Sequence, residues 1–169
     1  MNDTDPDWER RVAALWDAFD AHTPGDFSAR MTALVRELPT GHPVAAYERA
    51  SVHDALGHEV AAAGLYRDAL AGGLAGPRRR QAVIQYASTL RNLGRPAEGV
   101  TLLTAERDAA SDALDDAVAA FLALTLADAG RAREAVGVAL GALAPHLPSY
   151  TRSVGRYARE LAEPSPEQP

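Results

Sequence analysis

The 169-residue sequence predicts an all-α protein of about nine helices, arranged as a repeat array of helix pairs. Ala, Leu, Arg and Glu, which are strong helix formers, dominate the chain, and no alternating β-branched run typical of a strand occurs. Glycines and prolines interrupt the chain at intervals of about one helix length. Gly57, Gly94 and Gly130 are 37 and 36 residues apart, a period typical of proteins with two helices per repeat.

We expect helices at residues 6–21, 27–38, 43–56, 58–72, 77–93, 95–109, 112–129, 131–144 and 148–162. Each range lies between Pro or Gly breakers and carries apolar residues at i, i+3, i+4 and i+7. Pro43 and Pro77 suit the first position of a helix, whereas Gly57, Gly94 and Gly130 suit the left-handed residue that ends one.

The repeat period extends to residues other than glycine. About five residues after each glycine a small residue occurs, and seven residues before each glycine there is an alanine. These positions are Ala62, Gly99 and Ala135 after the glycines, and Ala50, Ala87 and Ala123 before them. A small side chain lets paired helices approach closely. Because neither helix of a pair can bury its apolar stripe alone, the units must stack.

These positions resemble the signature of the tetratricopeptide repeat, which runs W-x2-L-G-x2-Y, then Gly, then A-x3-F-x2-A. The unit from Pro43 has Ala46, Ala50, His53, Gly57, Ala62, Tyr66 and Ala69; the unit near Arg80 has Val83, Tyr86, Ala87, Leu90, Gly94, Gly99 and Leu103; the unit near Asp116 has Ala119, Leu122, Ala123, Leu126, Gly130, Ala135, Ala139 and Ala142. Glu106 stands where the signature has Ala, and Ala105 beside it suggests a one-residue slip. The chain looks most similar to short, free-standing bacterial tetratricopeptide proteins. This resemblance implies a right-handed α-solenoid of antiparallel helix pairs.

We expect one helical repeat domain over residues 1–162. Three repeats occupy 43–144, and the helices within 6–38 form a degenerate N-terminal pair. Helix 148–162 caps the last repeat. The tail 163–169 contains three prolines and no apolar anchor, so we expect it to be disordered.

Composition excludes several kinds of chemistry and partner. All 17 basic residues are Arg and there is no Cys, so lysine nucleophiles, P-loop lysines, disulfides and cysteine-ligated metals cannot occur. The formal charge of −6 lies in the first 60 residues, which opposes binding to nucleic acid or an anionic membrane. The longest apolar run, residues 117–127, is about half a membrane span. The acidic N-terminus lacks the apolar core of a signal peptide, which predicts a cytoplasmic location.

Sequence motifs predict no catalytic residue, no cofactor and no metal site. His58 and Glu59 begin an H-E-x-x-H pattern, but the second ligand position is Ala62. Gly57 ends the helix between His53 and His58, so we expect these side chains not to share a helix face, and we expect His53, at a repeat core position, to be packed or hydrogen-bonded. No G-x-S-x-G occurs, and we expect the protein not to be an enzyme.

The resemblance implies a scaffold that holds a protein or peptide partner in a concave groove lined by the first helix of each unit. The predicted groove residues lie on helix 77–93: Gln81, Ile84, Gln85, Ser88, Arg91 and Asn92. Their spacing makes one stripe opposite the core-facing side. Side-chain amides both donate and accept hydrogen bonds and can pair with a partner's backbone, whereas Arg91 suits a carboxylate.

Other interpretations stay open at this point. The stripe on helix 77–93 can be a solvated face or can contact the protein's own neighbouring helices. The array can self-associate as a homo-oligomer without a separate ligand, which an apolar patch on a terminal helix would favour. An enzyme or sensor built into the groove is a third alternative.

Some tetratricopeptide domains clamp a partner's C-terminal carboxylate with cationic side chains. No cation occurs at the matching positions of this chain, which are Tyr47, Ser51, Gln85, Ala117 and Phe121. We therefore expect acidic C-terminal tails not to bind.

Overall fold

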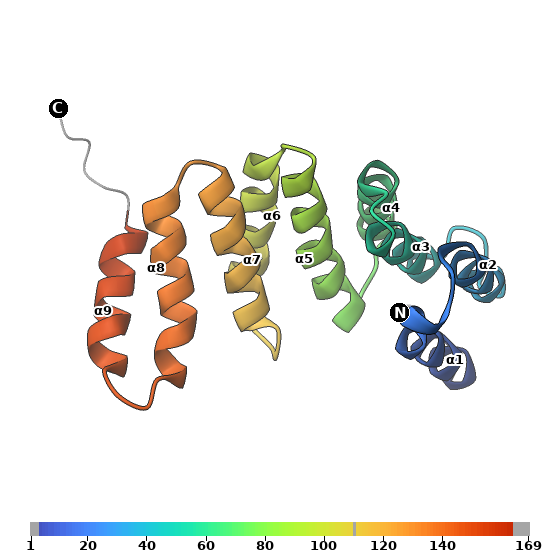
Figure 1. Ribbon diagram of the computed structural model, residues 1–169, viewed down its shortest axis with the longest axis horizontal. Coiled ribbons are helices and arrows are strands. Elements are labelled where there is room, and N and C mark those ends of the chain that lie inside the picture. Colours follow the sequence, from blue (N-terminus) through green and yellow to red (C-terminus); the bar gives the residue numbers. More distant parts are fainter. Residues whose placement is uncertain (1–3, 110, 164–169) are drawn as a thin grey trace. The chain divides into compact units, whose positions relative to one another are not determined.

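The computed structural model describes residues 4–109 and 111–163. Over these residues the chain forms nine α-helices and two short 3₁₀ helices, with no strand (Figure 1). The α-helices are α1 (Pro6–Asp17), α2 (Pro24–Val35), α3 (Pro43–Ala55), α4 (Glu59–Ala71), α5 (Pro77–Asn92), α6 (Pro96–Ala109), α7 (Asp115–Asp128), α8 (Ala132–Leu143) and α9 (Thr151–Ala162). The all-α prediction is therefore confirmed. Of the tail predicted to be disordered, residues 164–169 lie outside the described part of the chain.

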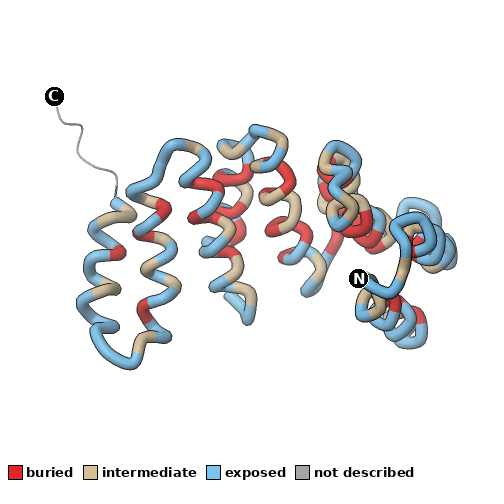
Figure 2. The backbone as a smooth tube through the Cα atoms, in the orientation of Figure 1, coloured by how far each residue is buried: buried red, intermediate tan, exposed pale blue. Residues whose placement is uncertain are grey.

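The chain divides into two compact units, and the boundary between Thr89 and Leu90 falls inside α5. In the first unit α1 packs on α2, α2 on α3, and α3 on α4. In the second unit α6 packs on α7, α7 on α8, and α8 on α9. Each α-helix carries both buried and exposed positions, as expected for elements that bury one side against a neighbour (Figure 2).

Three helix starts differ by three residues from the sequence prediction because of turns and side-chain caps. Helix α2 begins at Pro24, since the Thr23 hydroxyl accepts a hydrogen bond from the Asp26 N–H at 3.2 Å. Helix α7 begins at Asp115, because Asp112 instead closes a turn by accepting from the Leu114 N–H at 2.7 Å. Helix α9 begins three residues later than expected and follows a 3₁₀ turn at Ala144–His146.

The same glycine turn ends α3, α5 and α7. Gly57, Gly94 and Gly130 have φ of +73°, +73° and +78°, the left-handed conformation that glycine adopts without steric cost. After each glycine, the next N–H bonds back to the carbonyl five residues earlier. These bonds run from His58 to His53 (2.8 Å), Arg95 to Leu90 (2.8 Å) and Arg131 to Leu126 (2.9 Å). This is the Schellman arrangement, and it confirms the predicted role of the three glycines.

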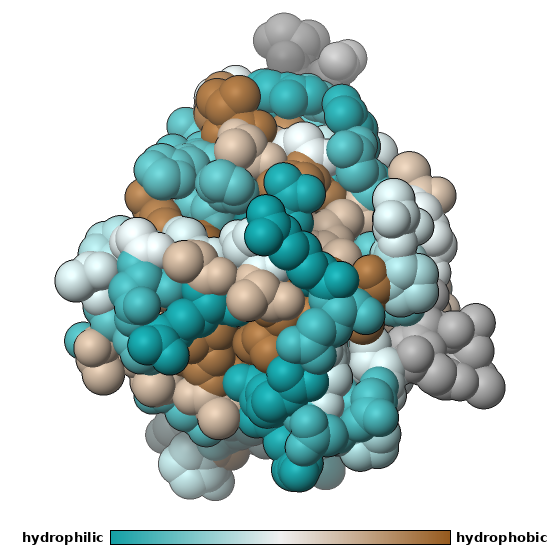
Figure 3. Space-filling view, turned by 90° about the vertical axis from the view of Figure 1, so that its right-hand side faces the viewer, coloured by the Kyte–Doolittle hydropathy of each residue, from teal (hydrophilic) through white to brown (hydrophobic). Residues whose placement is uncertain are grey.

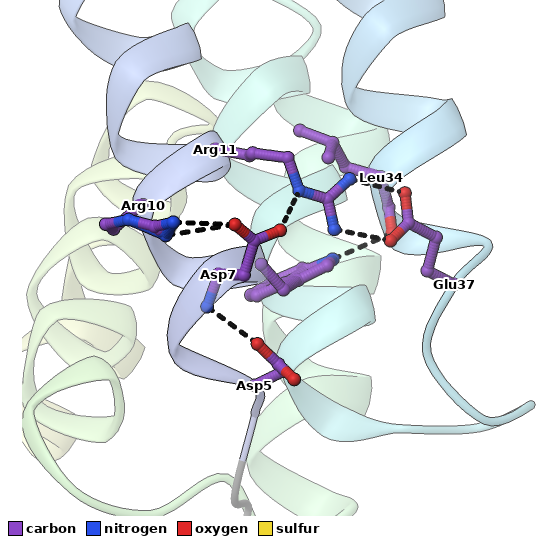
Figure 4. Close-up of polar contacts among 7 residues, drawn as sticks. Asp5, Asp7, Arg10, Arg11, Leu34 and Glu37 are labelled. Carbon is purple, nitrogen blue, oxygen red and sulfur yellow. Dashed lines mark hydrogen bonds and ion pairs between the residues drawn. The ribbon is translucent and has the colours of Figure 1, made fainter.

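In the first unit, α1 is joined to α2 by apolar and polar contacts. The Trp8 side chain is buried, and its indole N–H donates at 2.9 Å to the Leu34 carbonyl in the last turn of α2, which also accepts from the Glu37 N–H. Arg11 lies between Asp7 and Glu37 and bonds both carboxylates; its two bonds to Glu37 are 2.8 and 2.6 Å (Figure 4). These contacts hold the two N-terminal helices as a pair.

In the second unit, α8 and α9 approach almost to backbone contact. A Cβ atom placed on Gly137 would lie 2.6 Å from the Ala162 nitrogen and 2.7 Å from the Ala158 carbonyl oxygen. Only glycine fits this contact without moving a helix. Elsewhere in this unit Glu106 is buried and Ala105 is exposed, so the expected one-residue slip in α6 is wrong and Glu106 occupies the signature position itself.

Candidate functional site

Helices α3 and α5 are connected by polar side chains within the first unit. On α3, Tyr47, Ser51 and Asp54 follow the i, i+4, i+7 spacing of one helix face. On α5, Gln81 and Gln85 follow the same kind of spacing. Three contacts connect the two helices, and we call them together the α3–α5 ladder. They join Arg78 to Glu48, Gln81 to Tyr47, and Thr89 to Asp54.

The first contact surrounds a buried carboxylate. Glu48 is 2% exposed, and its two oxygens accept from Arg78 Nε at 2.9 Å and from the Trp16 indole N–H at 3.0 Å. Arg78 also bonds both oxygens of Glu9 in α1. Burial alone would lower the pKa of Arg78, but the hydrogen bonds and charges of Glu9 and Glu48 outweigh it and raise the pKa. The Arg78 guanidinium is therefore paired with carboxylates of the protein itself.

The second contact involves a buried phenol. The Tyr47 hydroxyl donates to Gln81 Oε1 at 3.1 Å. Burial raises the pKa of Tyr47 to about 12, with the charge of Glu48 acting in the same direction. Tyr47 therefore stays a neutral hydrogen-bonding group at any physiological pH.

The third contact surrounds Asp54 near the end of α3. One carboxylate oxygen accepts from the Tyr66 hydroxyl at 3.3 Å, and the other lies 3.3 Å from the Thr89 hydroxyl, whose single hydrogen is shared with the Gln85 carbonyl at 2.8 Å. Burial raises the pKa of Asp54, and the two donors partly offset this effect. The contact connects α3, α4 and α5.

The order of the contacts gives the direction of the helices. Residues 47 and 48 of α3 pair with 81 and 78 of α5, and residue 54 pairs with residue 89. Both helices therefore run in the same direction, as the first helices of successive helix pairs do.

Between the second and third contacts of the α3–α5 ladder, two buried polar atoms lack a hydrogen-bond partner within the described residues. Ser51 is 6% exposed, and its hydroxyl lies near those of Tyr47 and Tyr66. Neither Ser51 Oγ nor Gln85 Oε1 forms a hydrogen bond within the described residues, although both atoms are shielded from solvent. Buried polar atoms are rarely left without a hydrogen bond, so the unpaired Ser51 and Gln85 atoms need an explanation.

The six predicted groove residues have different environments. Gln81 and Asn92 are exposed, Gln85, Ser88 and Arg91 are half-buried, and Ile84 is buried. The first four, through Ser88, belong to the first unit, and Arg91 and Asn92 to the second. Arg91 forms an ion pair with Asp128 of α7 at 3.3 Å.

Comparison with known protein families agrees with this arrangement. Residues 43–161 match the family model described as the tetratricopeptide repeat. The chain belongs to the tetratricopeptide repeat family. Tetratricopeptide proteins are helical repeat solenoids that typically serve as non-catalytic scaffolds for protein–protein interaction, which indicates a protein partner for this chain. Neither the curated proteins nor the solved structures gave a match.

Other kinds of site receive no support from the described residues. Within residues 4–109 and 111–163, no group of three or more His, Cys, Asp or Glu side chains is placed to hold a metal ion. In the same part of the chain, every helix is too short or too polar to cross a bilayer. The side of the first unit that carries α1 and α2 is mainly hydrophilic, with smaller hydrophobic areas between polar side chains (Figure 3).

Sequence reasoning missed two features of the tetratricopeptide array. Arg78 and its carboxylate partners were not anticipated, although Arg78-Arg79-Arg80 is the longest run of basic residues in the chain. As expected, Gly57 ends the helix, so His53 and His58 do not share a helix face; the contact across the turn, where their Nδ1 atoms lie 3.4 Å apart, was not anticipated.

Proposed function

We propose that this tetratricopeptide protein is a non-catalytic scaffold that binds an extended peptide segment of a partner protein across α3 and the first-unit part of α5. The observation that carries this proposal is the pair of unpartnered atoms, Ser51 Oγ and Gln85 Oε1, between contacts that are satisfied. Both belong to first helices, which line the binding groove in this family, and both occupy positions that contact ligands in some members.

The chemistry of these groups suits a peptide main chain. A hydroxyl and a side-chain amide each donate and accept, so they can pair with either the N–H or the C=O of an extended segment. A buried polar group without a partner costs about 1–3 kcal/mol, and a small side-chain rotation toward a ligand would recover part of that cost on binding. The formal charge of −6, carried by the first 60 residues, favours a segment with some positive charge.

The proposal is tested by changing polar side chains that make no contact in the α3–α5 ladder. In the double variant Gln85→Ala with Ser88→Ala, the three ladder contacts remain, so the fold should be retained. Partners are captured from the source cell and quantified by mass spectrometry. We expect the affinity of the variant for them to fall by about tenfold, which corresponds to about 1.4 kcal/mol of binding free energy. The matched control is Arg67→Ala with Asp68→Ala on the exposed side of α4. Capture that is equal in the groove variant and the parent would contradict the proposed site.

Self-association is a second candidate, favoured by exposed apolar side chains in the second unit. Val136 and Leu143 of α8 and Tyr157 of α9 are about half exposed, at 50%, 49% and 50%. Val136 and Leu143 are seven residues apart and so share a face of α8. If this face mediates a dimer, Val136→Glu with Leu143→Glu would convert the dimer to a monomer in light scattering; a parent that is already monomeric rejects this candidate.

A further inference from the structure

The turn between α3 and α4 brings two imidazole rings together. The Nδ1 atoms of His53 and His58 lie 3.4 Å apart, and the ring planes are inclined by 52°. The left-handed Gly57 reverses the chain, and the His58 N–H bonds to the His53 carbonyl at 2.8 Å. The Schellman turn characteristically places these two side chains against each other. The contact is therefore fixed by backbone geometry.

The separation of the two nitrogens is at the long end for a hydrogen bond and matches that of two ligands on one ion. A hydrogen bond from an N–H group typically spans about 2.7–3.2 Å, which is shorter than the observed distance. Two nitrogen ligands on one tetrahedral ion, with bonds of about 2.0–2.1 Å, lie about 3.3–3.4 Å apart.

The equivalent turns of the other two units are built differently. Where the first unit has His53 and His58, the turn after α5 has Leu90 and Arg95, and the turn after α7 has Leu126 and Arg131. Both leucines are buried.

In those two turns the arginine bonds a glutamate three residues later. The distances are 2.6 Å from Arg95 to Glu98 and 2.7 Å from Arg131 to Glu134. In the first unit that position is Ala61, so His58 has a different neighbour from its equivalents. The first unit thus replaces a leucine and an arginine by two imidazoles at the two positions that the turn brings into contact.

The surroundings leave the pair open to an ion from solvent. His58 is exposed and His53 is partly exposed. Asp54 and Glu59 lie next to the pair in the sequence, which offsets the positive charge of Arg49. Neutral imidazole is a ligand that zinc, copper and nickel accept readily.

We propose that His53 and His58 form a two-imidazole site for a divalent transition-metal ion, bound through both Nδ1 atoms. Two protein ligands leave the remaining coordination positions to water or to a side chain of a bound partner. The site lies at the α3–α4 turn, and its test does not depend on peptide binding.

The experiment uses the full chain without a histidine tag, freed of metal, with Zn²⁺ as the probe in calorimetry. We expect one Zn²⁺ per chain, and a dissociation constant raised about tenfold or more in His53→Asn and in His58→Asn. The control is His146→Asn, a histidine whose Nε2 lies 3.0 Å from Asp116 and which should bind Zn²⁺ as the parent does.

A second measurement needs no variant. Substoichiometric Cu²⁺ should selectively broaden the imidazole NMR signals of His53 and His58 in the unmodified chain. The proposal is overturned if the parent does not bind Zn²⁺ at about 1 mM. It is equally overturned if both asparagine variants bind as the parent does, or if Cu²⁺ broadens other histidines first.

Discussion

The guanidinium group of Arg78, at the start of α5, makes hydrogen bonds of 2.8 and 2.7 Å to the carboxylate of Glu9 in α1, 69 residues earlier. It also bonds Glu48 of α3, and it lies 5.8 Å from the centre of the Trp8 ring and 6.0 Å from that of Tyr47. One side chain therefore connects three helices of the first unit and neutralises a buried charge.

Replacing Arg78 should destabilise the first unit strongly. In Arg78→Met the apolar stem remains, but the buried Glu48 carboxylate loses its cation, and we expect a loss of about 3 kcal/mol. Both tryptophans of the chain lie in α1, so urea unfolding followed by tryptophan fluorescence reports this unit. Arg67→Met, which removes an exposed pair, should change stability by less than about 0.5 kcal/mol. Equal effects of the two substitutions would show that Arg78 has no special role.

Two glycines of α8 form a matched pair. Gly137→Ala places a methyl group against the α9 backbone at 2.6 Å, and we expect a loss of about 1–3 kcal/mol. At Gly141 the added Cβ would meet only the Ala158 methyl, at 4.0 Å, so Gly141→Ala should gain about 0.5–1 kcal/mol from helix propensity. Thermal unfolding followed by circular dichroism measures both. A Gly137→Ala protein as stable as Gly141→Ala would mean that α9 does not pack here.

The alanine signature position of the third repeat can be tested in the same way. Ala123 in α7 is 8% exposed, and Ala123→Leu should overpack the helix crossing and cost about 1–3 kcal/mol. Ala127, four residues later, is exposed, so Ala127→Leu should be nearly neutral. An unchanged unfolding midpoint for Ala123→Leu would place the repeat register elsewhere.

Acid should weaken the first unit partly through Glu9. The Arg78 hydrogen bond holds the pKa of Glu9 below its ordinary value of 4.5, so the contribution of Glu9 to stability is complete above that value. It is lost as the pH falls through the lower pKa of the folded state. Glu9→Gln should be less stable than the parent at pH 7 and should lose less on acidification. Asp17→Asn, on the exposed part of the same helix, should follow the parent. If the free energy of unfolding of Glu9→Gln and of the parent changed with pH in parallel, Glu9 would not be the group responsible.

Peptides that end in an acidic segment with a free carboxylate should not bind at micromolar concentration. Arg78 is the cation of the α3–α5 ladder, and its guanidinium is already occupied by Glu9 and Glu48. Fluorescence anisotropy with a labelled acidic peptide tests this. Binding that disappears when the C-terminal carboxylate is amidated would show that the internal carboxylates are displaced.

The sequence was sufficient to predict the helices but not the contacts among their polar side chains. The period of Gly57, Gly94 and Gly130 follows from backbone conformation, which a local pattern encodes. The ladder depends on which arginine of a run of three reaches Glu48, and that choice is set by tertiary packing. The contact between His53 and His58 also lay beyond a local pattern: the glycine that ends the helix of His53 folds the chain so that residues five apart meet.

The long sequence separation of the Arg78–Glu9 contact has a consequence for synthesis of the chain on the ribosome. The partners that join α1 to α2, Trp8 with Leu34 and Arg11 with Glu37, are 26 residues apart and become available early. Arg78 is made 69 residues after Glu9, a delay of roughly 3–14 s at about 5–20 residues per second. During that interval the Glu9 carboxylate lacks its cation, as does the Glu48 carboxylate over the last 30 residues. The N-terminal helix pair can therefore form early, whereas its attachment to the rest of the first unit is completed only when the start of α5 emerges.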